Sequence, residues 1–188
     1  MASLGHLIAG IRIGGLGAAQ ARRLVERHRG PVYRLALRML ADPHEAEDVT
    51  QEVLLQLCRT RDGLAAGSDE GAWAYSIALN RCRDILRSHR HQFLQLAPLE
   101  ALDQEDPRPP PDLALEQARR EQRLLAALQR LPAGYREVLV LRDLEGQPYR
   151  RMCEILKLSE TNLKARVIRA RRALARMLRG EESGPDAT

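Results

Sequence analysis

Residues 149–178 read YRRMCEILKLSETNLKARVIRARRALARML, and this stretch decides the fold of the C-terminal part of the chain. Two short amphipathic segments meet at Leu158 and Ser159, and the second becomes densely basic. Between Ser159 and Arg179 there are seven Lys or Arg residues and one acid, Glu160. Because a short helix, a turn of about three residues and a basic helix make up a helix-turn-helix, we predict that this segment binds DNA.

The basic segment divides into two faces when it is placed on a helix of about 3.6 residues per turn. The packing face consists of Leu163, Val167, Ala170 and Leu174, and the outward face of Thr161, Lys164, Ala165, Ile168, Arg169 and Arg172. Ser159 is placed as the N-cap, where its hydroxyl accepts a hydrogen bond from a free amide of the first turn. The alternative is a solvated basic helix on the surface of a bundle.

The composition favours small helical domains and an anionic partner. The 188 residues carry a net charge of +5, with a pI near 9.5 and only 3% aromatic residues. Aliphatic residues, Ala and Arg suit helices rather than sheets, so we expect an all-α protein with almost no strand. The charge suits nucleic acid and also an anionic membrane surface, but no stretch approaches the roughly 20 apolar residues that span a bilayer.

The cysteines and the N-terminus give no sign of secretion. Cys58, Cys82 and Cys153 are an odd number and widely spaced, which predicts reduced, buried thiols in a cytoplasmic protein. Cys82, His89 and His91 form a weak candidate metal set without a second ligand pair, so we expect no metal and no cofactor. The apolar N-terminal run lacks preceding basic residues, which is unlike a secretory signal.

The pattern along the chain predicts two helical domains joined by a flexible linker. Residues 19–40 form a helix with a bend or break at Gly30–Pro31, and Asp42 with Pro43 at the first helical position begins a second helix that runs to about residue 59. A loop over 61–71 precedes a long helix over 72–91. The acidic, Pro-rich residues 92–112 form the linker. Helices over 113–131 and 135–144, with a turn at Gly146, then lead to the helix-turn-helix.

These assignments divide the chain into five parts. They are a flexible extension (1–19), an N-terminal helical domain (20–91), the linker (92–112), a C-terminal helix-turn-helix domain (113–179) and a disordered tail (180–188).

The N-terminal domain presents two chemically different surfaces. On the long helix, Ser76, Asn80, Arg83 and Arg87 group opposite the apolar side, with Trp73 at their margin. Arginines bind phosphates, an amide pairs with a base edge and an aromatic ring stacks on an unpaired base, so this face suits nucleic acid. The alternative for Trp73 is a place in the core.

The helix that precedes the long helix carries an acidic face. Asp48, Gln51, Glu52 and Leu55 form an acidic patch with one exposed aliphatic side chain, and this combination suits a basic protein surface.

Three blocks of the sequence, in this order, resemble bacterial sigma factors of the extracytoplasmic-function (ECF) group. ADPHEAEDVTQEVLLQL is similar to that family's D-A-E-D-x-x-Q-E-x-F helix, and AWAYSIALNRCRDILRSHRH to its W-L-x-x-I-A-x-N-x-x-x-D-x-x-R segment. LPAGYREVLVLRDLEGQPYRRMCEILKLSETNLKARVIRARRAL is similar to the family's region 4. The resemblance covers residues 21–178 and implies a non-enzymatic subunit of RNA polymerase with sigma regions 2 and 4.

The resemblance also implies partners and site residues. Asp48, Gln51 and Glu52 would bind the clamp coiled coil of the largest polymerase subunit, with the polymerase flap as a further contact. The −10 element would be bound by three residues of the long helix, together with the 61–71 loop. The three residues are Asn80, Arg83 and Arg87. The −35 element would be bound by Ser159, Thr161, Lys164, Arg166 and Arg169. The linker would thread towards the polymerase active centre, and an anti-sigma factor would bind between the domains.

The sequence departs from the family at several positions of the helix-turn-helix. Lys157 stands where the family usually has Gly, so either a left-handed backbone there costs about 1 kcal/mol or the turn differs from that of the family. Pro148, Arg150 and Arg151 replace the usual Ser and acidic residues, and Cys153 replaces a small Ala.

Three other functions are weighed against this interpretation. A helix-turn-helix regulator that acts without polymerase leaves the acidic Asp48 patch and the Asn80 face unexplained. A regulator whose N-terminal helices bind only another protein is a further alternative. A nuclease or metal hydrolase is opposed by the lack of clustered acids and of a Gly-rich phosphate loop, so we expect no catalytic residue.

Overall fold

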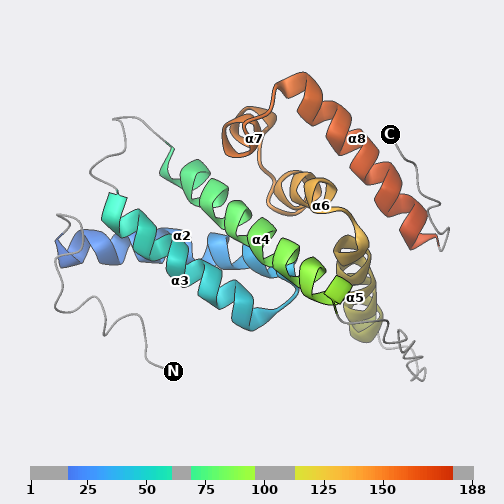
Figure 1. Cartoon of the computed structure of the whole chain (residues 1–188), viewed down its shortest axis with the longest axis horizontal. Helices are drawn as coiled ribbons and strands as arrows, with labels where there is room; N and C mark the ends of the chain where they lie inside the picture. The colour runs from blue at the N-terminus through green and yellow to red at the C-terminus, as the bar shows by residue number, and fades with distance from the viewer. Residues whose placement is uncertain (1–16, 61–68, 96–112, 180–188) are drawn as a thin grey trace.

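In the computed structural model, residues 17–60, 69–95 and 113–179 are described, and every regular element among them is a helix (Figure 1). This confirms the prediction of an all-α protein. In chain order the elements are α2 (Ala18–Leu40), α3 (Pro43–Thr60), α4 (Glu70–Gln95), α5 (Leu113–Arg130), α6 (Ala133–Leu139), the π-helical segment η2 (Val140–Leu144), α7 (Tyr149–Leu156) and α8 (Glu160–Leu178). Most of the predicted extension, most of the linker and the tail lie outside the described residues, and the predicted end of the extension is wrong, because Ala18 and Ala19 belong to α2.

Helices α2, α3 and α4 pack together as the N-terminal domain. Each helix contributes the apolar face that its sequence period predicts, and Val53, Leu57 and Ala78 are fully buried. Burial of such side chains is the main favourable contribution to folding, about 1.5–3 kcal/mol for each large aliphatic group.

Helix α2 does not break at Pro31, where the sequence predicts either a bend or a break. It is continuous from Ala18 to Leu40 with Pro31 inside it. Proline in a helix interior removes one backbone hydrogen bond and costs about 3 kcal/mol. The face on which Leu24 and Leu35 lie is buried on both sides of the proline, so packing against α3 and α4 holds the helix together.

Helix α3 begins as the sequence predicts. The Asp42 carboxylate accepts hydrogen bonds from the amides of His44 and Glu45 at 2.7 and 2.9 Å, and the Glu45 amide is the main cause of a lowered pKa at Asp42. Pro43 occupies the first helical position, where it has no amide to leave unpaired.

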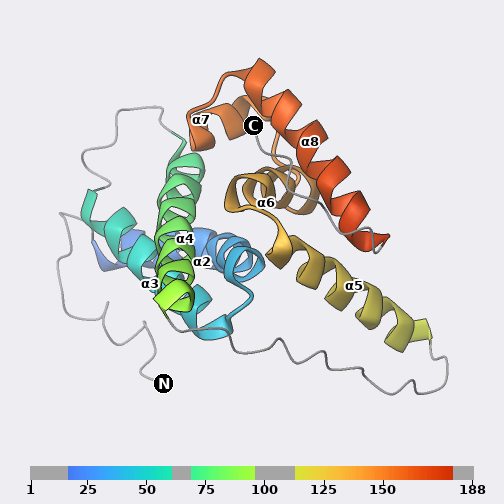
Figure 2. The same cartoon turned by 45° about the vertical axis from the view of Figure 1, so that its right-hand side comes forward.

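The C-terminal domain differs in detail from its prediction. The helix expected over 135–144 begins at Ala133 and widens into η2 at Val140. The turn at Gly146 is confirmed, since its φ is +65° and glycine adopts such angles without strain. Helix α8 packs against α6, α7 and α5 (Figure 2).

Helix α4 continues beyond the predicted end of the first domain to Gln95.

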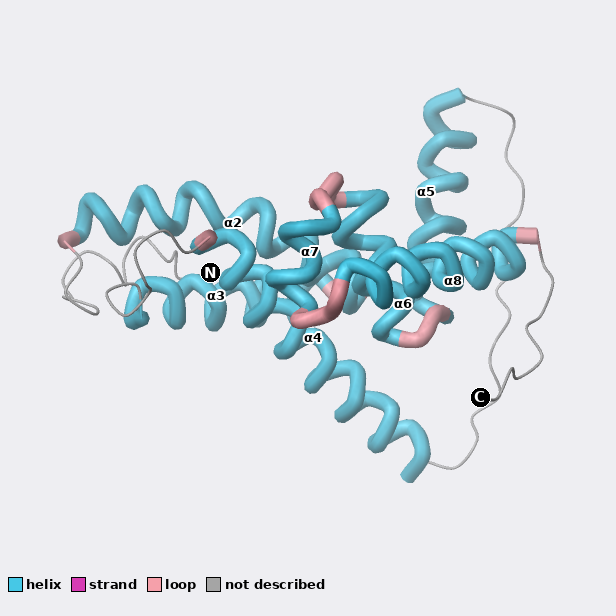
Figure 3. The backbone as a smooth tube through the Cα atoms, turned by 90° about the horizontal axis from the view of Figure 1, so that it is seen from above, coloured by secondary structure: helices cyan, strands magenta, loops and turns pink. Residues whose placement is uncertain are grey.

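The two domains contact each other through α2 and α4 on one side and α5, α6, η2 and α7 on the other. Helix α4 lies beside α7, as Figures 1 and 2 both show, whereas the C-terminal end of α4 and the helix α5 project from the body of the molecule (Figure 3). Arg136 is buried at this junction and donates to the carbonyl oxygens of Met39 and Leu131. No helix within the described ranges is long and apolar enough to span a membrane.

Lys157 carries the left-handed backbone that the sequence comparison anticipates, with φ 56° and ψ 41° at the C-cap of α7. The substitution Lys157→Gly removes the β-carbon, whose crowding against the backbone causes the strain at a positive φ. We expect the free energy of unfolding to rise by about 0.5–1 kcal/mol, after the extra chain entropy of glycine in the unfolded state is subtracted. Urea denaturation followed by circular dichroism measures this change.

Lys157→Ala is the matched control, because it loses the same side chain and keeps the strain. An equal gain in Lys157→Ala would show that the backbone angle is not the cause.

Candidate nucleic-acid and protein interfaces

The outward face of α8 is basic and open, as its period predicts. Leu163, Val167 and Ala170 are buried, and Leu174 is partly buried against the core. The side chains predicted to face outward are all exposed, and Ile168 is 52% exposed among them. Lys164 lies 2.6 Å from Glu160, and this hydrogen bond raises the pKa of the lysine. The face therefore carries permanent positive charge where a phosphate chain could lie.

The start of α8 has the geometry that an N-cap requires. Ser159 has an extended backbone, and its hydroxyl oxygen accepts from the amide of Asn162 at 3.4 Å, which confirms the predicted cap. Ser159 and Thr161 are exposed at this end, where the free amides of the first turn also point. Arg166 is partly buried, and Arg169 is exposed one turn further along.

The ring of Tyr149 in α7 lies against two cations, Arg142 of η2 and Lys164 of α8. The guanidinium carbon of Arg142 lies 4.7 Å from the centre of the Tyr149 ring, and the Lys164 ammonium lies 5.7 Å from it. Arg171 of α8 adds an ion pair with Asp143 of η2. These contacts fix α8 against the segments before it, so the basic face has a defined orientation.

The acidic face of α3 also lies where the sequence places it. Asp48 and Glu52 are exposed, and Gln51 is partly exposed. Leu55 is only partly exposed, so it is a smaller apolar contribution than predicted. Glu52 lies 2.7 Å from Arg81 of α4, an exposed pair that water weakens.

The predicted nucleic-acid face of α4 is divided between solvent and the C-terminal domain. Asn80 and Arg87 are exposed. Ser76 lies at the domain contact, with its hydroxyl 2.9 Å from the carbonyl oxygen of Ile155 in α7. Arg83 donates from Nε and Nη2 to the two carboxylate oxygens of Glu137 in α6, at 2.5 and 2.8 Å. Trp73 is partly buried and packs against the core.

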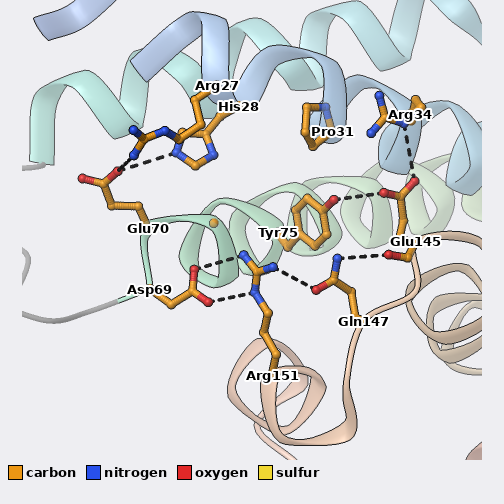
Figure 4. A pocket seen from close by; sticks show the side chains of 11 residues that line it. Arg27, His28, Pro31, Arg34, Asp69, Glu70, Tyr75, Glu145, Gln147 and Arg151 are labelled. Carbon is orange, nitrogen blue, oxygen red and sulfur yellow. Dashed lines mark hydrogen bonds and ion pairs between the residues drawn. The ribbon is translucent and has the colours of Figure 1, made fainter. Parts of the chain in front are cut away.

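A cavity of about 680 Å³ lies beside this contact, between α2, the start of α4 and the segment that joins η2 to α7 (Figure 4). Arg151 points from α7 to Asp69, with Nη2 3.0 Å from Oδ1, and donates from Nη1 to Gln147 at 3.0 Å. Burial acts to raise the pKa of Asp69, but the Ala72 amide and Arg151 outweigh it and lower that pKa. A β-carbon at Gly71 would lie 2.3 Å from Arg151 Nη2, so a larger residue there would displace the end of the Arg151 side chain.

Burial shifts the pKa values of a histidine and a tyrosine that line the cavity. His28 lies 3.6 Å from Glu70, yet burial dominates and lowers its pKa, which keeps the imidazole neutral near pH 7. Burial and the neighbouring Glu145 raise the pKa of Tyr75.

The side chains of the weak candidate metal set, Cys82, His89 and His91, do not form a metal site as far as the structure describes them. Cys82 is buried, and burial raises the pKa of its thiol to about 12, while His89 is engaged with Glu45 at 2.8 Å. No group of three or more potential ligands occurs among the side chains that the structure describes.

Sequence reasoning missed the acidic residues of the domain contact. Glu137 is 2% exposed and Glu145 has a side chain only 6% exposed, and both bind groups of the N-terminal domain. Glutamates at these positions look like ordinary surface residues in the sequence. The one available signal is that Glu137 falls on the apolar side of its short helix, next to Val138.

Two family models match the chain, one for each domain. Residues 24–92 match Sigma-70 region 2, and residues 121–174 match Sigma-70, region 4. The chain belongs to the RNA polymerase sigma factors. SigM of Mycobacterium tuberculosis places it in the ECF group, with 32% identity over 158 residues that cover 83% of this chain and 76% of SigM.

A second relative agrees with that placement, and a solved structure shares the fold. ECF sigma factor SigE of Mycolicibacterium smegmatis is 32% identical over 153 residues, which cover 80% of this chain, and the chain spans 58% of that relative. The solved structure of CnrH in complex with the cytosolic domain of CnrY shares the fold, with a TM-score of 0.66, 23% identity and coverage of 95% of this chain and 97% of CnrH.

The Tyr149 ring provides a direct test of how the helix-turn-helix is held together. Tyr149→Leu removes the ring that Arg142 and Lys164 face. We expect it to lower the free energy of unfolding by about 1–2 kcal/mol, since each partly exposed cation–π contact contributes about 0.5–1 kcal/mol. Tyr149→Phe keeps the ring and should stay close to the wild type. Equal losses in the two variants, measured by urea denaturation, would contradict the assignment.

Proposed function

We propose that this sigma factor binds core RNA polymerase and directs it to promoters by recognising −10 and −35 elements. The observation that carries the proposal is the separation of charge between two sigma regions. Region 2 offers exposed carboxylates on α3, and region 4 offers an exposed basic face on α8. A protein partner and a nucleic acid can therefore be bound at the same time on different surfaces.

The α3 face is the proposed polymerase contact. Asp48 and Glu52 supply charge, while Gln51 and Leu55 supply polar and apolar contacts at their side. A basic, partly apolar coiled coil, such as the clamp of the largest polymerase subunit, is the complementary surface.

The two DNA contacts are assigned to α4 and α8. Asn80, Arg83 and Arg87, with Ser76 and Trp73 beside them, would bind the non-template strand of the −10 element. Ser159, Thr161 and Lys164 at the start of α8, with Arg166 and Arg169 behind them, would bind the −35 element in the major groove and along its phosphates. Residues 96–112, acidic and rich in proline, would act as the tether that lets the domains reach both elements.

An anti-sigma factor is the proposed regulator. The sigma factor RpoE of Bartonella quintana, solved in complex with the anti-sigma factor NepR, shares the fold of this chain, with a TM-score of 0.64 and 22% identity. A pull-down from the native cell tests this: recovery of a tight partner other than polymerase supports it, and repeated failure to recover one counts against it.

The polymerase contact is tested by Asp48→Ala together with Glu52→Ala. We expect the complex with purified core RNA polymerase to be lost or weakened at least tenfold, because about 1.4 kcal/mol of contact energy is a factor of ten in affinity. Gel filtration and fluorescence anisotropy measure this. Glu26→Ala, an exposed acid on α2, is the control. Full binding by the double variant would contradict the α3 assignment.

The −35 contact is tested by Lys164→Ala and Arg169→Ala. We expect each to weaken binding to promoter duplex and to reduce the salt slope of the binding constant by about one, as the loss of one phosphate contact does. Polymerase binding should be unchanged. Arg130→Ala, at the end of α5, is the control. Duplex binding without any polymerase binding by the wild type would favour the stand-alone helix-turn-helix regulator.

A further inference from the structure

The cavity of about 680 Å³ beside the domain contact has the size of a small-molecule site. Such sites commonly measure about 300–1,000 Å³ and often lie between domains. Helix α2 and the start of α4 line it on one side, and residues 145–151 line it on the other (Figure 4). Buried residues of both domains belong to one apolar core, so the cavity is formed without a ligand.

Two arginines of α2 line the cavity with donors for which the described part of the chain supplies no acceptor within hydrogen-bond distance. Arg27 and Arg34 each have their nearest carboxylate oxygen at 3.9 Å. Glu145, the acid nearest to Arg34, is already held by the guanidinium of Arg38 and by the hydroxyl of Tyr75. The guanidinium of Arg34 is therefore available to an anion from outside the chain.

A buried histidine of α2 also lines the cavity. His28 is 8% exposed, and its Nε2 has no hydrogen-bond partner among the described residues. The nearest carboxylate oxygen, of Glu70, lies 3.6 Å away. A buried polar atom without a partner costs free energy, and a hydroxyl group of a ligand would supply that partner.

The groups that await a partner lie at opposite ends of the cavity, as Figure 4 shows. Arg27 and His28 lie at one end, and Arg34 lies at the other. Pro31 and Tyr75 lie between them. Seven positions of one helix separate residues 27 and 34, which corresponds to a rise of roughly 10 Å. A molecule that reaches both ends is therefore larger than a single inorganic ion.

We propose that this cavity binds a small phosphorylated sugar, with the phosphate at Arg34 and the hydroxyl groups at the His28 end. A guanidinium holds phosphate oxygens in pairs, which gives both charge and direction to the contact. At the other end the Glu70 carboxylate and the imidazole accept from hydroxyl groups, and Arg27 donates to them. Tyr75 and Pro31 supply apolar surface for the sugar ring between the two ends.

The acids around the cavity favour a compact ligand over a nucleic-acid strand. Asp69, Glu70 and Glu145 bring three negative charges into the same lining. A strand carries a phosphate at every nucleotide, so several phosphates would lie close to these acids. A phosphorylated sugar presents one anionic group, and its hydroxyl groups are donors that a carboxylate accepts.

Titration of the isotope-labelled full chain with ribose 5-phosphate tests the site. Nuclear magnetic resonance follows the backbone amides of Gly71, Tyr75 and Gln147, which line the cavity from both domains. We expect these signals to shift together, with a Kd on the order of 1 mM or tighter, as is usual for a ligand of this size. Signals that stay in place at saturating concentrations of ribose 5-phosphate overturn the proposal.

The phosphate end is tested by Arg34→Gln, which replaces a half-exposed side chain and leaves the core intact. We expect the Kd for ribose 5-phosphate to rise about tenfold, because one charge-assisted contact is lost. Arg29→Gln is the matched control, since it removes the same charge from α2 at a residue that pairs with Glu47 of α3. An equal rise in both variants would show only a general attraction for anions and would contradict the site.

The hydroxyl end is tested by His28→Phe with two probes. Inorganic phosphate reaches only Arg34, whereas ribose 5-phosphate also reaches residue 28. We expect the variant to bind ribose 5-phosphate several-fold more weakly and inorganic phosphate as the wild type does. Equal losses for the two probes would contradict the placement of the hydroxyl groups, and the exposed Arg34 variant keeps the site testable if His28→Phe does not fold.

The same signals identify the source of the phosphate. We expect ribose 5-phosphate to bind the wild type more tightly than inorganic phosphate, and a single-stranded oligonucleotide to leave the cavity signals in place. Equal binding of inorganic phosphate would reveal a site for an anion alone. An oligonucleotide that shifts the cavity signals and displaces ribose 5-phosphate would assign the cavity to nucleic acid. Either result overturns the small-molecule site.

Discussion

The structure depends on one buried cation, the guanidinium of Arg136. It is 4% exposed and donates to the Met39 carbonyl at the end of α2 and to carbonyl oxygens of Gln129 and Leu131 at the end of α5. Burial lowers its pKa, yet an arginine stays charged at any physiological pH. The carbonyl groups it satisfies belong to both domains, so the same side chain joins α5 to α6 and region 4 to region 2.

Polar groups join the two sigma regions beside the apolar core that they share. Arg136 faces the carbonyl oxygen of Met39, and its neighbour Glu137 faces Arg83. Consecutive residues of one short helix thus carry opposite charges to two places on the N-terminal domain. These polar contacts fix the geometry of the junction, although buried ion pairs themselves add little net stability.

The helices, their caps and their exposed faces were largely predictable from the sequence, because they depend on local rules. The caps at Asp42 and Ser159 follow from side chains that accept hydrogen bonds at helix starts, and the open face of α8 follows from its period. The sequence predicts a bend or a break at Pro31, and the helix does not break there because tertiary packing outweighs the local cost of proline. The pairing of Arg83 with Glu137 joins residues 54 positions apart in different domains, and helical periodicity carries no information on such contacts. Periodicity treats each domain as if it stood alone, so it predicted that Ser76 and Arg83 would face outward.

As a sigma factor, the chain is expected to make polymerase start transcription at particular promoters. The direct measurement is in vitro transcription by purified core RNA polymerase on fragments of the native genome, with and without the chain, followed by mapping of the RNA 5′ ends. We expect transcripts that depend on the chain, begin at discrete positions and share two short sequence blocks upstream. Transcription that is unchanged by the chain, while the chain still binds duplex DNA, would contradict it.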